Sequence, residues 1–70
     1  MFPQIEAKRV AAGILQKDLC ERANVHETTY TARKSNRRSL SETTLKKLEL
    51  ALEELIDERR VELEKIGGAA

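Results

Sequence analysis

The sequence predicts an all-α protein, built from four or five helices and ending in an extended C-terminal helix. The composition is rich in the helix formers Ala, Leu, Glu, Lys and Arg, and Phe2 and Tyr30 are its only large aromatic residues. No glycine or proline interrupts residues 42–66. At a rise of about 1.5 Å per residue, this stretch predicts a helix of about 40 Å.

The first helix is expected to begin at the N-terminus. Pro3 suits a first helical turn, where its missing N–H has no hydrogen bond to lose. Ile5, Val10 and Ile14 are interpreted as one apolar side of this helix. Gly13 is expected to end it, because glycine readily adopts the left-handed backbone conformation found after helix C-termini.

A second helix is predicted over residues 15–23. Leu15, Leu19 and Ala23 recur every four residues, which predicts one buried stripe. Asn24 is expected to end the helix, since asparagine tolerates the left-handed conformation.

A third, short helix is predicted over residues 27–34, with His26 or Thr28 as its N-cap. The serines and Asn36 that follow indicate a loop. Ser41 is then well placed to cap the long C-terminal helix.

Charge is distributed unevenly along the chain. Residues 1–47 contain ten Lys and Arg against five Asp and Glu, whereas residues 48–70 contain three against seven. The difference is +5 in the first part and −4 in the second, in agreement with the net charge of +1. This pattern suggests a basic face for a polyanion and a different role for the acidic part, although ordinary solvated surface explains the charges equally well.

The sequence lacks the signals of several other classes. Cys20 and His26 are each the only residue of their type, so neither an internal disulfide nor a zinc site is expected. No phosphate-binding glycine loop and no nucleophile–base pair is present, so we expect no cofactor and no enzyme activity. No signal peptide or membrane span is apparent, and the expected location is cytoplasmic.

The segment GILQKDLCERANVHETTYTARKSNRRSLSETTLKKLELAL resembles the Cro/repressor-like (Xre-type) helix-turn-helix family, and the resemblance extends over about residues 4–53. Gly13 stands where the family often has glycine before the motif, and Gln16 matches the glutamine that usually opens the second helix. Asn24 and Asn36 replace two family glycines, a mild change because asparagine tolerates positive φ.

Two positions depart from the family pattern. Tyr30 stands where Ile or Val is frequent, and Arg33 where an inward-facing Ile or aromatic residue is common. We therefore expect the third helix to pack on Tyr30, as a core aromatic with a hydrated hydroxyl, and Arg33 to extend outward toward phosphate.

The resemblance implies that the third helix enters the major groove of double-stranded DNA. The residues expected to contact bases are Glu27, Thr28, Thr31 and Ala32. Those expected to contact phosphate lie at the start of the second helix, at the end of the third helix and in the loop after the third helix: Gln16, Lys17, Arg33, Lys34, Asn36, Arg37 and Arg38. The alternatives are a first-turn glutamate that only stabilises its helix, and a basic loop that is merely solvated.

The predicted organisation is a DNA-binding domain over residues 1–53, a helical extension for dimerisation over 54–66 and a flexible tail over 67–70. The extension continues an apolar stripe, and we expect few other residues of the same chain to cover it. The expected homodimer interface consists of Leu52, Leu55, Ile56, Arg59, Leu63 and Ile66.

The resulting hypothesis is a homodimeric transcriptional repressor that binds an inverted-repeat operator. One alternative is an antitoxin whose acidic C-terminal helix also binds a protein partner. Another is an adaptor that retains the fold without binding DNA.

Overall fold

The computed structural model describes the backbone of residues 1–68 and the side chains of residues 1–64. Four helices and no strand occur in this part of the chain: α1 (Phe2–Ala11), α2 (Gln16–Ala23), α3 (Glu27–Lys34) and α4 (Glu42–Gly68). The predicted all-α class is therefore confirmed, with the lower of the two expected helix numbers. Of the predicted tail 67–70, residues 67 and 68 still belong to α4, and residues 69–70 lie outside the described residues.

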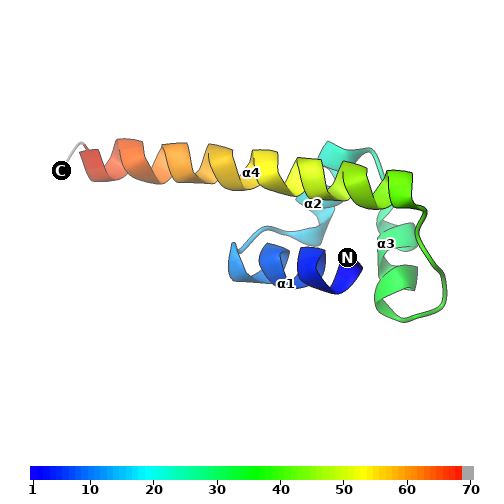
Figure 1. Cartoon of the computed structure of the whole chain (residues 1–70). Helices are drawn as coiled ribbons and strands as arrows, with labels where there is room; N and C mark the ends of the chain where they lie inside the picture. The colour runs from blue at the N-terminus through cyan, green and yellow to red at the C-terminus, as the bar shows by residue number, and fades with distance from the viewer. Residues whose placement is uncertain (69–70) are drawn as a thin grey trace.

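The long helix α4 runs the whole length of the molecule (Figure 1). α1 and α2 pack against it, and α3 lies next to its N-terminal end, in contact with α2. Beyond α1, the C-terminal part of α4 projects away from the other helices. The helix begins as predicted, because the Ser41 hydroxyl accepts a hydrogen bond from the backbone N–H of Thr44 at 3.2 Å.

Three turns end the short helices in the same way. Gly13, Asn24 and Asn36 have φ values of 69°, 58° and 58°. After each of them, the next N–H donates to the carbonyl five residues earlier, for example from Val25 to Cys20 at 2.9 Å. The predicted left-handed turns at Gly13 and Asn24 are confirmed, and Asn36 makes the turn that its family position implies.

The core lies where α1, α2 and α3 meet the N-terminal half of α4. Its largest fully buried side chains are Tyr30, Leu19, Leu48 and Leu52. Burying side chains of this size stabilises the fold by about 1.5–3 kcal/mol each. The prediction that α3 packs inward through Tyr30 is confirmed, because that residue is 0% exposed, but its hydroxyl is not hydrated as expected and instead donates to Glu6.

Two apolar residues that were expected in the core lie on the surface. Val10 is 61% exposed and Leu15 is 64% exposed. Val10 follows Ile5 by five residues, which places it about 140° around the helix from that buried side chain. Leu15 precedes α2 with extended backbone angles, so the four-residue periodicity does not include it.

A third correction concerns Leu52, which the sequence placed in the dimer interface. It is 1% exposed and already belongs to the core of its own chain. Leu55 and Ile56, one turn further, are half-buried against that core. The apolar stripe of α4 therefore serves the fold for one turn more than expected.

Candidate nucleic-acid interface

The outer face of α3 carries the residues predicted to contact bases. Glu27, Thr28 and Thr31 are exposed, whereas Tyr30 on the opposite face is buried. Ala32 is half-buried, and its small side chain adds no bulk to the helix. His26 is the N-cap of α3, although its side chain makes no capping hydrogen bond.

Aromatic packing fixes the position of α3 against α1. The rings of Tyr30 and Phe2 lie 5.1 Å apart between centroids, in an edge-to-face arrangement. The guanidinium carbon of Arg33 lies over the Phe2 ring, 4.8 Å from its centre, which adds a second contact between α3 and α1. Arg33 also donates to the Asn36 side-chain oxygen at 3.2 Å, so its side chain runs along the surface of the domain.

A carboxylate on α1 joins the same two helices. Glu6 accepts a hydrogen bond from the Tyr30 hydroxyl at 2.6 Å and two from the Arg9 guanidinium at 2.8 and 2.9 Å. Arg9 in turn donates to the Ile14 carbonyl at 2.7 Å, which ties the network to the turn before α2.

This network holds Glu6 in its charged form. The hydrogen bond from Arg9 is the largest cause that lowers the pKa of Glu6 below its ordinary value of 4.5. The hydrogen bond from Tyr30 and the charges of Arg9 and Lys34 act in the same direction, against the opposing effect of burial. At neutral pH the carboxylate is therefore ionised and available as an acceptor for all three donors.

Gln16 connects the start of α2 to the outer face of α3. Its side-chain Nε2 donates to the Thr31 hydroxyl oxygen at 2.8 Å, and its Oε1 accepts a hydrogen bond from Lys34 Nζ at 3.1 Å. Lys34 Nζ also lies 3.8 Å from the Glu6 carboxylate. Three residues predicted separately as DNA contacts are thus hydrogen-bonded to one another.

The remaining predicted phosphate contacts border this face. Lys17 is exposed in the first turn of α2. Asn36, Arg37 and Arg38 are exposed in the loop that follows α3. The turn at Asn36 directs this loop, because the Arg37 N–H donates to the Ala32 carbonyl at 2.9 Å.

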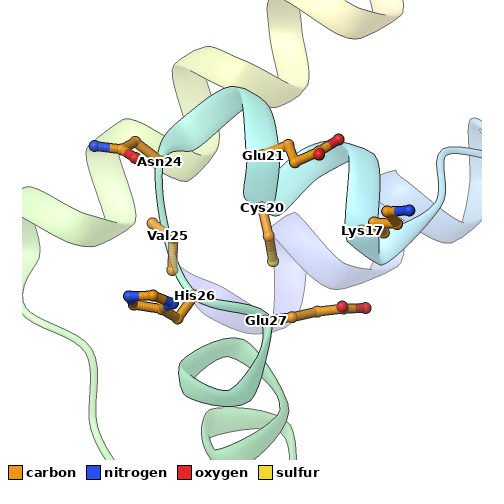
Figure 2. Close-up of a pocket in the computed structure, with 7 residues that line it drawn as sticks. All are labelled: Lys17, Cys20, Glu21, Asn24, Val25, His26 and Glu27. Atoms are coloured by element: carbon orange, nitrogen blue, oxygen red, sulfur yellow. The ribbon is translucent and has the colours of Figure 1, made fainter.

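A shallow hollow lies at the turn between α2 and α3 (Figure 2). Cys20 and Val25 line its floor, and the charged ends of Lys17 and Glu27 lie on one side of it.

Burial is the main cause that raises the pKa of the Cys20 thiol to about 11, with a smaller effect of the Glu27 charge. A thiol with this pKa is a poor nucleophile, in agreement with the interpretation of Cys20 as a small buried residue. No group of metal-ligating side chains occurs among the described residues.

Two arginines attach the projecting part of α4 to the domain. Arg22 on α2 pairs with Glu58, with Nη2 and Oε1 2.9 Å apart. Arg59, which was predicted in the dimer interface, donates to the Gly13 carbonyl at 2.7 Å. Leu63 is 65% exposed beyond these contacts, and the side chain of Ile66 lies outside the described residues.

Sequence reasoning missed Glu6 and Arg9. Their separation of three residues on a helix is the spacing of an ion pair, and this signal could have identified the pair. It could not have identified Tyr30 as the third partner, because that contact spans 24 residues of sequence.

Comparison with known families agrees with this architecture. The family model described as helix-turn-helix matches residues 5–58, five residues further along α4 than the predicted boundary at residue 53. No curated protein and no solved structure matches the chain. In the described part of the chain, no helix has the length and apolar character needed to cross a membrane. The chain therefore belongs to the helix-turn-helix family of the Cro/C1 (Xre) type, which is a family of DNA-binding domains and not of enzymes.

Proposed function

We propose that the protein is a transcriptional repressor that binds an inverted-repeat operator as a homodimer, with α3 in the major groove. The observation that carries this proposal is the division of α3 into two faces. Tyr30 anchors the inner face in the core, while Glu27, Thr28 and Thr31 present short polar side chains outward. The outer face of a helix held in this way can enter the groove while Tyr30 stays packed in the core.

The outward residues match the chemistry of base edges. The Glu27 carboxylate can accept a hydrogen bond from the amino group of cytosine. Thr28 and Thr31 each offer a hydroxyl to a base or a methyl group to thymine. Ala32, which is small and half-buried, allows close approach of the α3 backbone to the groove.

The proposed phosphate contacts surround α3 on two sides and set its register on the duplex. Gln16 and Lys17 lie at the start of α2, and the others follow along α3 and its loop: Arg33, Lys34, Asn36, Arg37 and Arg38. Arg37 and Arg38 are the strongest candidates, because they are adjacent in the exposed loop after α3 and neither side chain forms an ion pair within the described residues.

The projecting part of α4 is the proposed dimer element. Leu63 is exposed there, on the same side of the helix as Leu55 and Ile56, which are half-buried at its base. Such apolar residues on a helix that extends beyond its own domain favour contact with a second copy. The acidic side chains of this segment would be repelled by DNA, which favours a position away from the duplex. A dimer bound over a promoter would repress by keeping other proteins off that DNA, and it would need no further activity.

Selection of bound duplexes from a random DNA pool tests this proposal. The expected result is an enriched inverted repeat whose half-site centres are about 34 Å, or one helical turn, apart. Exchange of both Arg37 and Arg38 for Glu should weaken binding on the order of 100-fold at fixed salt. The control is Lys8→Glu, at an exposed lysine on α1 outside the proposed DNA and dimer contacts, which should have a much smaller effect.

Recovery of no sequence by the folded protein would contradict the proposal. The second candidate function is then binding of a protein partner by α4, as in an antitoxin or an adaptor, which the exposure of Leu63 favours. Sedimentation analysis separates the two, since a homodimer shows a mass that depends on protein concentration. A chain that remains monomeric at all concentrations leaves the apolar face of α4 to a different partner.

A further inference from the structure

The orientation of the Gln16 amide is determined by Lys34. An ammonium group has only hydrogens to donate, so the atom of Gln16 that faces Lys34 Nζ at 3.1 Å has to be the acceptor Oε1. The amide nitrogen Nε2 therefore faces the Thr31 hydroxyl, 2.8 Å away. The Glu6 carboxylate, 3.8 Å from Lys34 Nζ, holds the ammonium group on this side of the domain.

This orientation fixes the role of the Thr31 hydroxyl toward Gln16. An amide nitrogen donates, so the hydroxyl oxygen accepts, and the hydroxyl hydrogen has to point away from Gln16. No other hydrogen bond of this hydroxyl occurs among the described residues, and Thr31 is exposed on the outer face of α3. A hydroxyl that accepts one hydrogen bond also becomes a better donor in the next, because the bonds in a chain polarise one another.

We propose that Lys34 and Gln16 set Thr31 as a hydrogen-bond donor, so that Thr31 selects a base whose exocyclic group in the major groove is an acceptor oxygen and not an amino group. The acceptors that stand where adenine and cytosine carry amino groups are guanine O6 and thymine O4. In this proposal, which rests on the proposed insertion of α3 into the major groove, Lys34 determines specificity without touching the base. Its role differs from a phosphate contact, which carries no sequence information.

The substitution Gln16→Glu tests the direction of the hydrogen bond with almost no change of shape. A carboxylate only accepts, so the Thr31 hydroxyl would have to donate to it. The outward side of Thr31 would then offer only lone pairs, which suit the amino groups of cytosine and adenine. Gln4→Glu, at an exposed position on α1, serves as the control for the added negative charge.

Two further pairs of variants complete the design. Thr31→Val removes the hydroxyl and keeps the shape, whereas Thr31→Ser keeps the hydroxyl. Lys34→Met removes the group that orients the amide, and Lys17→Met removes an exposed lysine of the same proposed interface whose side chain makes no hydrogen bond to the Gln16 amide. Each folded variant, checked by circular dichroism, is passed through the same selection from random DNA as the wild-type protein.

The expected result concerns one position in each half-site. At that position the wild-type protein should prefer guanine or thymine by about fivefold, which is the effect of one hydrogen bond of ordinary strength. Thr31→Val should abolish this preference and Thr31→Ser should retain it. Gln16→Glu should shift the same position toward cytosine or adenine, and Lys34→Met should relax it. Lys17→Met and Gln4→Glu should change affinity at all sequences alike.

Other outcomes overturn the inference and leave the proposed function in place. One is a wild-type operator whose base preferences do not change in Gln16→Glu or Thr31→Val. Another is a Lys34→Met protein that weakens binding evenly, as Lys17→Met does, which would make Lys34 a phosphate contact only. If the wild-type protein enriches no sequence, the proposed function fails first, so the two failures are distinguishable.

Discussion

The hydroxyl of Tyr30 lies 2.6 Å from the carboxylate of Glu6, and this single hydrogen bond joins the centre of α3 to α1. The ring of Tyr30 is buried in the core, so the bond stands at the boundary between the apolar interior and the polar network around Arg9. The helix proposed to read DNA is therefore held both by packing and by a charged acceptor.

The substitution Tyr30→Phe isolates this hydrogen bond, because it keeps the buried ring and removes only the hydroxyl. Since the acceptor is charged but partly exposed, we expect a loss of about 1.5 kcal/mol in the free energy of unfolding, measured by urea denaturation. A double-mutant cycle with Glu6→Ala provides the control, since alanine offers no acceptor to the Tyr30 hydroxyl. Purely additive effects of the two substitutions would show that the bond does not stabilise the protein.

The acid sensitivity of the protein should depend on Glu6. The pKa of this carboxyl is lowered in the folded protein, mainly by the hydrogen bond from Arg9, so the folded state favours the ionised form. The stabilisation is then present above the ordinary pKa of 4.5 and is lost as the pH falls through the lower value of the folded protein.

Urea denaturation of the wild-type and Glu6→Gln proteins across this pH range measures the effect. The wild-type protein should be the more stable at neutral pH, and the difference should shrink below about pH 4. Glu58, whose pKa is also lowered by its partner Arg22, is present in both proteins and cancels in the comparison. A difference that stays constant with pH would show that ionisation of Glu6 does not contribute.

The local parts of the fold could be predicted from sequence, because each depends on residues close together in the chain. The turns at Gly13 and Asn24 follow from the few residue types that adopt positive φ, and the start of α4 follows from the Ser41 cap. The inward direction of Tyr30 could also be predicted, since it follows from the helical register of the family.

The parts that were missed depend on where separate helices meet. Leu15 fits a four-residue period but lies before α2 begins, and Leu52 was assigned to the dimer interface although it lies in the core of its own chain. In the site, the exposed face of α3 was anticipated. The bonds of Gln16 to Thr31 and Lys34 span 15 and 18 residues, and no local pattern specifies such partners.

Two leucines of α4 should respond differently to removal of their side chains. Leu52→Ala should lower the free energy of unfolding by about 3 kcal/mol, because it leaves a cavity in the core. Leu63→Ala should change it by less than about 0.5 kcal/mol at concentrations where the protein is monomeric. It should instead raise the dissociation constant of the proposed dimer about tenfold, measured by sedimentation.

Leu50→Ala is the matched control for this comparison, because Leu50 is exposed on α4 outside the proposed interface. It should alter neither stability nor association. If Leu63→Ala leaves the dissociation constant unchanged as well, the projecting part of α4 does not form the dimer contact.

Gly13→Ala should destabilise the protein through backbone strain alone. Gly13 has a φ of 69°, a conformation that costs a residue with a Cβ atom about 1 kcal/mol. An added Cβ would lie 3.6 Å from the guanidinium of Arg59, which is ordinary van der Waals contact and adds no clash. Gly13→Asn should cost less than Gly13→Ala, since asparagine tolerates this conformation and occupies it at Asn24 in this same chain.

Arg59→Met distinguishes strain from crowding. The Gly13 carbonyl that accepts from Arg59 is present in the alanine variant too, so the loss of that hydrogen bond should cost the same in either background. If strain is the cause, Gly13→Ala should lower the free energy of unfolding by equal amounts with and without Arg59, as urea denaturation of the four proteins would show. A smaller cost in the Arg59→Met background would mean that the alanine methyl crowds the arginine, and that the turn itself accepts a side chain.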